Sequence, residues 1–219
     1  MNINQDLFKK FSSNISNNTK LSNYSWFNLG GPAEYLFKPE NGNQLIEFLK
    51  DNKKNKFGIT ILGAGSNTLI RDNGIKGVVI KLGSGFSNIR IIDKETIEVG
   101  AATLDRKIAN FAKDNEIGNL EFLSCIPGSI GGAVIMNSGC YDNDISKVLT
   151  SINVIDITEC KEREIQRNEI EFFYRGTNLP NNLIITSVKL RGKLKPKREI
   201  EKKQTEFIEK KKINSTKSN

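Results

Sequence analysis

The chain has 219 residues, with 33 Lys and Arg against 25 Asp and Glu, 37% hydrophobic residues and no histidine. Its length suits one or two domains with a buried core, and its composition is that of a globular protein. Without histidine the chain cannot contain a Ser-His-Asp, Cys-His or HExxH active site of its own. Its chemistry must therefore come from carboxylates, Arg, Lys, Ser, Tyr, Cys or a bound cofactor.

Apolar residues recur at helical or strand spacing along most of the chain. Two amphipathic helices are predicted, over residues 43–54 and over residues 103–116, the second with Leu104, Ile108, Phe111 and Ala112 on one face. The expected strands cover residues 59–62, 77–82, 89–92, 96–99, 150–158 and 183–190, with Asp93-Lys94-Glu95 as a hairpin turn. Because strands and helices do not alternate strictly, the predicted fold class is α+β rather than a doubly wound sheet.

The positive charge is confined to the C-terminal segment. The formal net charge is +8, and residues 189–219 hold twelve Lys and Arg against four Glu, so the first 188 residues are neutral. Pro196 is placed to begin a helix, and Ile200, Phe207 and Ile208 follow at helical spacing. This pattern predicts an amphipathic helix with a solvated basic face. Nucleic-acid binding is the weaker interpretation, because no aromatic residues interleave the lysines to stack on bases.

The remaining composition signals concern location and metals. The N-terminal residues have no apolar signal-peptide core, and no apolar run approaches the ~18 residues of a membrane span. Cys125, Cys140 and Cys160 fit no metal-ligand spacing. They are expected to be reduced thiols, in a cytoplasmic protein with no membrane partner and no metal.

A first glycine loop follows the strand predicted at residues 59–62. It comprises Gly63, Ala64, Gly65, Ser66 and Asn67. Glycines after a strand let backbone amides approach an anion, and Ser66 and Asn67 add side-chain donors. The loop is neither a P-loop nor a good Rossmann fingerprint, since Thr68 replaces the third glycine and a turn follows. A plain glycine turn between strands explains this loop equally well.

A second glycine loop has four glycines and a proline within thirteen residues. Its candidate binding residues are Pro127, Gly128, Ser129, Gly131, Gly132 and Gly139. Pro127-Gly128 predicts a turn, and Ser129 is placed to cap a short helix whose free amides would form an anion site. A purely structural explanation is weaker here. Two anion-binding loops suggest a pyrophosphate, hence a dinucleotide, and without a Rossmann signature a flavin is favoured over a nicotinamide.

Five segments in this order resemble a known family. They are Trp26–Ala33, Gly63–Asn67, Glu121–Ala133, Met136–Tyr141 and Phe173-Tyr174-Arg175. Together they resemble the UDP-N-acetylenolpyruvoylglucosamine reductases, over about residues 20–212. The resemblance implies an FAD-binding PCMH-type (vanillyl-alcohol-oxidase-like) fold, in which both glycine loops hold the flavin pyrophosphate. The implied organisation is an extension over 1–20, an FAD-binding domain over 21–192 with subdomains 21–83 and 84–192, and a basic helix and tail over 193–219.

The resemblance also implies an activity. In the family, NADPH reduces FAD, and the flavin passes a hydride to UDP-N-acetylglucosamine enolpyruvate, giving UDP-N-acetylmuramate for peptidoglycan precursor synthesis. Arg175 matches the catalytic arginine of the family, and a guanidinium suits a substrate carboxylate because it is always charged and binds bidentately. Without the resemblance, Arg175 would be taken for a surface arginine.

The sequence departs from the family pattern at its C-terminal end. Family members continue into a substrate domain with a Gly-Ser-Thr-Phe-Lys-Asn-Pro motif, whose Ser donates a proton, and with a catalytic Glu. Ser215 echoes this motif only faintly and is not assigned that role. The 219 residues are therefore expected to bind FAD but to turn over slowly or not at all. The alternatives are a non-catalytic FAD- or nucleotide-binding module and, less favoured, a nucleic-acid-binding protein.

Overall fold

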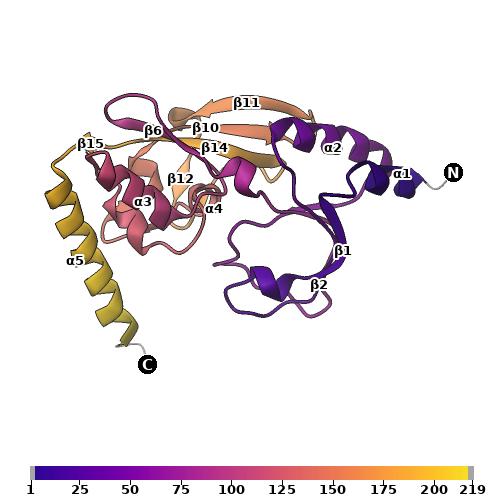
Figure 1. Ribbon diagram of the computed structural model, residues 1–219, viewed down its shortest axis with the longest axis horizontal. Coiled ribbons are helices and arrows are strands. Elements are labelled where there is room, and N and C mark those ends of the chain that lie inside the picture. The colour runs from indigo at the N-terminus through magenta and orange to yellow at the C-terminus, as the bar shows by residue number, and fades with distance from the viewer. Residues whose placement is uncertain (1–2, 217–219) are drawn as a thin grey trace.

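Two separate sheets organise the chain in the computed structural model, which describes residues 3–216 (Figure 1). The first sheet has the strand order β1-β2-β4-β3. Strands β1 (Ile15–Lys20) and β2 (Pro32–Phe37) are antiparallel, whereas β4 (Ile75–Ile80) runs parallel to both β2 and β3 (Ile59–Ile61). The carboxyl ends of β2, β3 and β4 therefore meet at one edge, where the first glycine loop begins.

Helices α1 (Ile3–Lys10) and α2 (Gly42–Asn55) pack against the first sheet. The Asn41 side chain caps α2 by accepting a hydrogen bond from the Gln44 amide at 3.0 Å. Leu45, Phe48 and Leu49 are buried, as the spacing predicted. The strand predicted at residues 59–62 is an edge strand, and Ile61 is exposed.

The second sheet is fully antiparallel, in the order β11-β10-β14-β6-β5. Its strands are β5 (Ile89–Ile91), β6 (Thr96–Gly100), β10 (Leu149–Asp156), β11 (Lys161–Gln166) and β14 (Leu183–Arg191). The predicted hairpin at residues 89–99 is present as β5 and β6. The Asp93 carboxylate closes its turn by accepting hydrogen bonds from the Glu95 and Thr96 amides. Strand β11 was missed, because its charged residues alternate with few apolar ones.

Helices α3 (Asp105–Asp114) and α4 (Ile130–Ile135) lie below this sheet in Figure 1. Ile108 and Ala112 of α3 are buried in the core, as predicted. The prediction for Leu104 was wrong: it sits just before the helix, in extended backbone, and is 56% exposed. One residue of extended chain takes Leu104 off the helical repeat that placed it on the apolar face.

The basic segment forms α5 (Lys197–Thr216), which follows Pro196 as predicted and runs beside α3 (Figure 1). Ile200 and Phe207 are buried, and the Phe207 ring stacks on Tyr141 at a centroid distance of 5.3 Å. The Gln204 side chain donates to the Ala109 carbonyl of α3. One lysine of the basic face also makes a specific contact, because the Lys211 ammonium donates to the Cys125 carbonyl at 2.8 Å.

Short elements complete the structure. The paired strands are β7 (Ile117–Gly118) with β15 (Lys193–Leu194), β8 (Gly139–Cys140) with β9 (Asn143–Asp144), and β12 (Phe172–Phe173) with β13 (Gly176–Thr177). The 3-10 turns are η1 (Leu21–Tyr24), η2 (Ser84–Phe86), η3 (Glu121–Cys125), η4 (Ile145–Lys147) and η5 (Arg167–Glu169). The mixture of an antiparallel sheet, a mixed sheet and packed helices confirms the α+β class.

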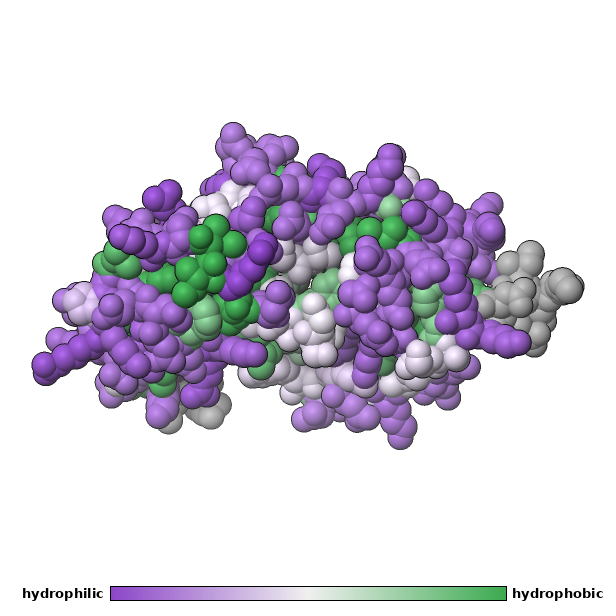
Figure 2. All heavy atoms as spheres, turned by 45° about the horizontal axis from the view of Figure 1, so that its top comes forward, coloured by the Kyte–Doolittle hydropathy of each residue, from purple (hydrophilic) through white to green (hydrophobic). Residues whose placement is uncertain are grey.

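The two sheets share part of their core. Ile155 and Ile184 of the second sheet are fully buried in the cluster that also contains Phe37 of β2 and Phe48 of α2. On the face shown in Figure 2, hydrophilic side chains predominate, and apolar residues appear in patches on either side of a paler centre. Within residues 3–216, no helix is both long and apolar enough to cross a membrane.

Candidate functional site

The two glycine loops lie against each other, although more than sixty residues separate them in sequence. The Ser66 hydroxyl of the first loop donates to the Pro127 carbonyl of the second at 2.8 Å. The Ser129 hydroxyl lies 3.3 Å from the position that a Cβ on Gly63 would take. The structure thus brings the residues predicted at 63–67 and at 127–132 into one place.

The first loop presents unused backbone donors. No acceptor for the amides of residues 63–67 is found among the described residues. Gly65 has a φ of +70°, and a Cβ there would overlap the Tyr24 carbonyl, so this glycine is required by the turn itself. A backbone so shaped, with free amides following a strand, forms an anion-binding concavity.

The second loop differs from the predicted arrangement of free amides. Ser129 occupies the position before α4, but its side chain makes no capping hydrogen bond. The Ile130 and Gly131 amides donate to the carbonyls of Thr103 and Ala101, so they are not free for an anion. The segment that follows β6 therefore accepts hydrogen bonds from two of the amides that were expected to be free. In the first turn of α4, the Gly132 amide is left without an acceptor in the described part of the chain.

The glycines of the two loops fall into two groups. A side chain on Gly131 would press on Ala101, 3.0 Å from its Cβ, and one on Gly139 would overlap the Asn143 carbonyl. These glycines serve packing. A Cβ on Gly132 would meet nothing nearer than the Ser129 hydroxyl at 3.9 Å, and Gly63 has only that same neighbour at 3.3 Å. Packing does not explain Gly63 and Gly132, and their missing side chains leave room for a ligand beside the free amides.

Arg175 lies next to the end of the second loop. It sits in the turn between β12 and β13 with a φ of +59°, and its guanidinium donates to the Gly139 carbonyl at 3.2 Å. Asn137 donates to the Phe173 carbonyl, which ties the same hairpin to the loop. Arg175 is exposed, and its guanidinium stands 5.3 Å from the Tyr174 ring centre. The predicted catalytic arginine and Gly139 are therefore in direct contact.

Two residues that were not predicted line this region. Asp105, the first residue of α3, is completely buried, and neither carboxylate oxygen has a hydrogen-bond partner among the described residues. Burial raises the pKa of this carboxyl to about 8. One of its oxygens lies 3.2 Å from the Cβ position of Gly128, while its amide donates to the Gly128 carbonyl. The second residue is Lys81, whose ammonium donates to the Gly63 carbonyl at 2.5 Å.

Neither residue stands out in the sequence. Aspartate is common in the first turn of any helix, so nothing in the sequence marks Asp105 as a site residue. Lys81 falls within the strand predicted at residues 77–82, a prediction that assigns its side chain no role. Only the packing of distant segments shows that both side chains reach the glycine loops.

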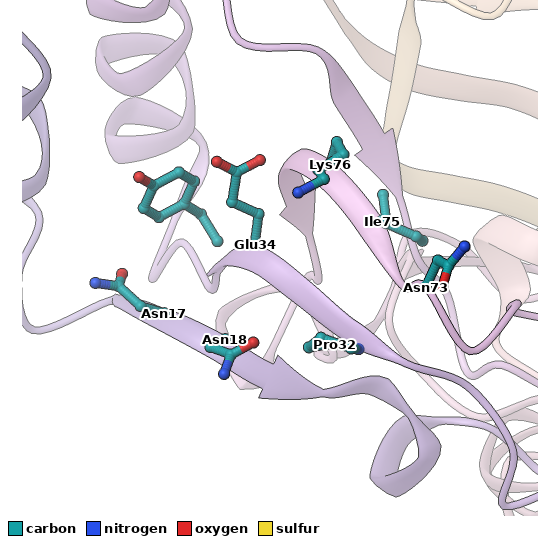
Figure 3. A pocket seen from close by; sticks show the side chains of 8 residues that line it. Asn17, Asn18, Pro32, Glu34, Asn73, Ile75 and Lys76 are labelled. Carbon is teal, nitrogen blue, oxygen red and sulfur yellow. The ribbon is translucent and has the colours of Figure 1, made fainter.

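Two hollows in the surface lie away from this site. One of about 210 Å³ is on the outer side of the first sheet, where Glu34 and Lys76 rise from neighbouring strands (Figure 3). Another is lined by residues of α2 and by Asn181 and Asn182. Neither contains a residue of the glycine loops. Across residues 3–216, no group of three or more Cys, Asp or Glu side chains is arranged to hold a metal ion.

Comparison with known proteins gives consistent matches. The family model described as FAD binding domain matches residues 33–160, more than half of the chain. A protein of Pelagibacter ubique named UDP-N-acetylenolpyruvoylglucosamine reductase is 44% identical over 211 residues, which are 93% of this chain and 68% of that protein. The protein of that name in Rickettsia felis is 47% identical over 165 residues, 75% of this chain and 55% of its own length.

Solved structures agree with these relatives. The UDP-N-acetylenolpyruvylglucosamine reductase of Thermus caldophilus superimposes with a TM-score of 0.78 at 30% identity, over 90% of this chain and 69% of that one. p-Cresol methylhydroxylase superimposes with a TM-score of 0.62 at 15% identity, which shows a shared fold alone. These matches confirm the predicted PCMH-type flavin-binding fold. The chain spans between about half and two thirds of the length of these reductases.

Proposed function

The chain belongs to the UDP-N-acetylenolpyruvoylglucosamine reductase family, and from this membership we propose that residues 3–216 bind FAD for the reduction of UDP-N-acetylglucosamine enolpyruvate to UDP-N-acetylmuramate. The reductant in this proposal is NADPH, and the place is the peptidoglycan precursor pathway of the cytoplasm. The FAD-binding domain extends over residues 21–192 in the proposal, and the basic segment 193–219 follows it.

One observation carries the flavin-binding part of the proposal. The unpartnered amides of residues 63–67 stand beside the second loop, at the contact between Ser66 and Pro127. A pyrophosphate needs several N–H donors at close range, and glycines without side chains allow it to approach the backbone. Gly63 and Gly132 supply that room, so the residues present fit the diphosphate of FAD. Ala64, Gly65, Ser66, Asn67, Pro127, Gly128, Ser129, Gly131 and Gly139 complete the proposed binding loops.

FAD, when bound, supplies the hydride-transfer chemistry, and the protein supplies position and charge. We assign Arg175 to the carboxylate of the enolpyruvyl group. One N–H of its guanidinium is used by the Gly139 carbonyl, which leaves further donors for a bidentate contact with a carboxylate. No described carboxylate forms an ion pair with Arg175, so its charge is available to stabilise negative charge that develops on the substrate.

The first experiment is a visible absorption spectrum of the purified 219-residue protein, followed by release of the chromophore with heat. We expect a yellow protein that releases FAD, because both loops are formed in this chain. A colourless protein that also takes up no added FAD would contradict the proposal. In the yellow protein, oxidation of NADPH that depends on the UDP-sugar would test the reductant and the substrate separately.

A second candidate function is FAD binding without turnover. The 219 residues span 55% of the length of the Rickettsia felis relative, so the test concerns the part of the relatives that they do not match. Adding the remaining C-terminal part of a close relative in trans discriminates the two. Recovered turnover supports a reductase whose active site is completed by that part, and bound FAD without any turnover supports a flavin-binding module.

A further inference from the structure

A lysine outside the predicted site contacts the first peptide of the first glycine loop. Lys81 directly follows β4, and its ammonium donates to the Gly63 carbonyl at 2.5 Å. Gly63 follows the neighbouring strand β3, so the contact joins the carboxyl ends of two parallel strands. This is the edge at which open α/β sheets bind their ligands.

The surroundings of Lys81 contain a second cation and no counterion. Lys38, which follows β2, donates to the Tyr24 hydroxyl at 2.8 Å, and both ammonium groups stand over the Tyr24 ring, at 4.7 Å for Lys38 and 5.6 Å for Lys81. Neither lysine forms an ion pair with a carboxylate of the described chain. Burial, and after it the charge of Lys38, lower the pKa of Lys81.

The contact with Gly63 fixes the direction of a donor. In a trans peptide the C=O and N–H groups point in opposite directions. Holding the Gly63 carbonyl toward Lys81 therefore turns the Ala64 amide away from Lys81. The Ala64 amide is one of the unpartnered donors of the loop.

We propose that Lys81 is a positioning residue, which orients the Gly63–Ala64 peptide so that its amide faces the pyrophosphate of the bound nucleotide, with Lys38 adding positive charge at the same edge. The inference rests on the proposed FAD binding and names a residue that serves it from behind the loop. A purely structural lysine would be expected to face water or a carboxylate. A half-buried ammonium beside a second cation is unfavourable by itself, and an anion on the other side of the loop offsets that cost.

The test compares two ligands that differ in phosphate. Dissociation constants for FAD and for riboflavin, which has no phosphate, are measured by flavin fluorescence in the wild type and in Lys81→Met. We expect FAD binding to weaken on the order of tenfold, about 1.4 kcal/mol, and riboflavin binding to change less than about twofold. Lys76→Met is the matched control, because Lys76 is an exposed lysine on β4 that lines the outer hollow in Figure 3, and it should leave both constants unchanged.

Further variants separate positioning from general stability. Lys81→Arg retains a charged donor and should recover most of the FAD affinity. Lys38→Met keeps the Gly63 contact and should weaken FAD by about two- to threefold, since only the more distant charge is lost. If Lys81→Met does not fold, the Arg variant and the Lys38 variant still decide: FAD constants equal to the wild type in Lys38→Met and far weaker in Lys81→Arg contradict the proposal.

The outcomes also separate this inference from the proposed function. Wild-type protein that binds FAD, with Lys81→Met equal to it or equally impaired for FAD and riboflavin, overturns the role of Lys81 alone. Wild-type protein that binds neither flavin contradicts the proposed function and this inference together.

Discussion

Asp105 is a buried carboxyl whose surroundings favour its neutral form. Its pKa of about 8 in the folded chain stands well above the 3.8 of an ordinary Asp, and burial alone is the cause. Between these values the unfolded chain loses the proton while the folded chain keeps it. The folded state is therefore destabilised as pH rises, by about 1.4 kcal/mol for each pH unit, until Asp105 itself ionises near pH 8.

We predict that Asp105→Asn removes this dependence, because the amide is neutral at every pH. In urea unfolding of the flavin-free protein, the variant should gain stability relative to the wild type as pH rises from 5 to 8. A difference between the two proteins that stays constant over this range would show that Asp105 is already ionised at pH 5.

Gly131 and Gly132 are neighbours in α4 with opposite expected responses to a methyl group. Gly132→Ala places its Cβ in open space and replaces a helical glycine, so it should stabilise the protein by about 0.5–1 kcal/mol. The same methyl stands beside the free amides of the proposed binding loops and should weaken FAD binding. Gly131→Ala is the matched control: it presses on Ala101 and should lower stability.

Thermal unfolding gives the stability of each variant, and FAD titration gives its dissociation constant for FAD. We expect Gly132→Ala to be more stable than the wild type but to bind FAD more weakly, and Gly131→Ala to be less stable. A Gly132→Ala protein that is more stable and binds FAD as tightly as the wild type would remove Gly132 from the proposed site. Gly132 is assigned to the site because a Cβ there would have almost no protein neighbours. Comparing the two variants tests that assignment directly.

At the scale of elements, α5 supports the second glycine loop at both ends. Lys211 bonds the Cys125 carbonyl just before the loop, and Phe207 stacks on Tyr141 just after it. The basic helix is thus a structural neighbour of the candidate site, and its lysines do not form a uniform solvated face.

We predict that Lys211→Met loosens the loop, because a charged donor to a backbone carbonyl is lost. The unfolding free energy should fall by about 1 kcal/mol, and amide hydrogen exchange over residues 126–132 should speed up. Lys202→Met, an exposed position on the same helix, should change neither quantity. Faster exchange in both variants alike would mean that helix charge in general, and not the Cys125 contact, supports the loop.

At the scale of the whole molecule, the two sheets are coupled through a common core. Ile155 belongs to β10 of the second sheet, yet it packs in the cluster of Phe37 and Phe48 and approaches the start of α2 at Gly42. The glycine loops contact each other through Ser66 and Pro127. The site therefore depends on how the two sheets are held relative to each other.

We predict that Ile155→Ala destabilises the packing around both sheets together, by about 2–5 kcal/mol, as large-to-small changes in a core do. Hydrogen exchange should accelerate in α2 and in β14 to a similar extent. Acceleration confined to β10 and β14 would show that the two sheets unfold independently. Ile91→Ala, at an exposed position of β5, is the control and should have little effect.

The sequence by itself determined the α+β class, most of the core elements and the two glycine loops. These features depend on local spacing: apolar residues at helical repeats marked α2 and α5, and the density of glycine marked both loops. The family resemblance added the prediction of a catalytic role for Arg175, which composition alone does not distinguish from any other surface arginine. Strands such as β11 escaped prediction because an exposed edge strand needs no apolar pattern.

The tertiary structure decided which groups of the loops are available. Segments from distant parts of the chain meet at the loops. Their packing decides which amides are free and which glycines are not needed for packing, and it creates the carbonyl contacts of Lys81, Arg175 and Lys211. The sequence predicts free amides at Ile130 and Gly131, but in the structure these amides donate to the carbonyls of Thr103 and Ala101. Nothing in the sequence marks Asp105, which is buried without a hydrogen-bond partner among the described residues. Hydrogen bonding and desolvation are properties of neighbours in space, which spacing along one chain does not specify.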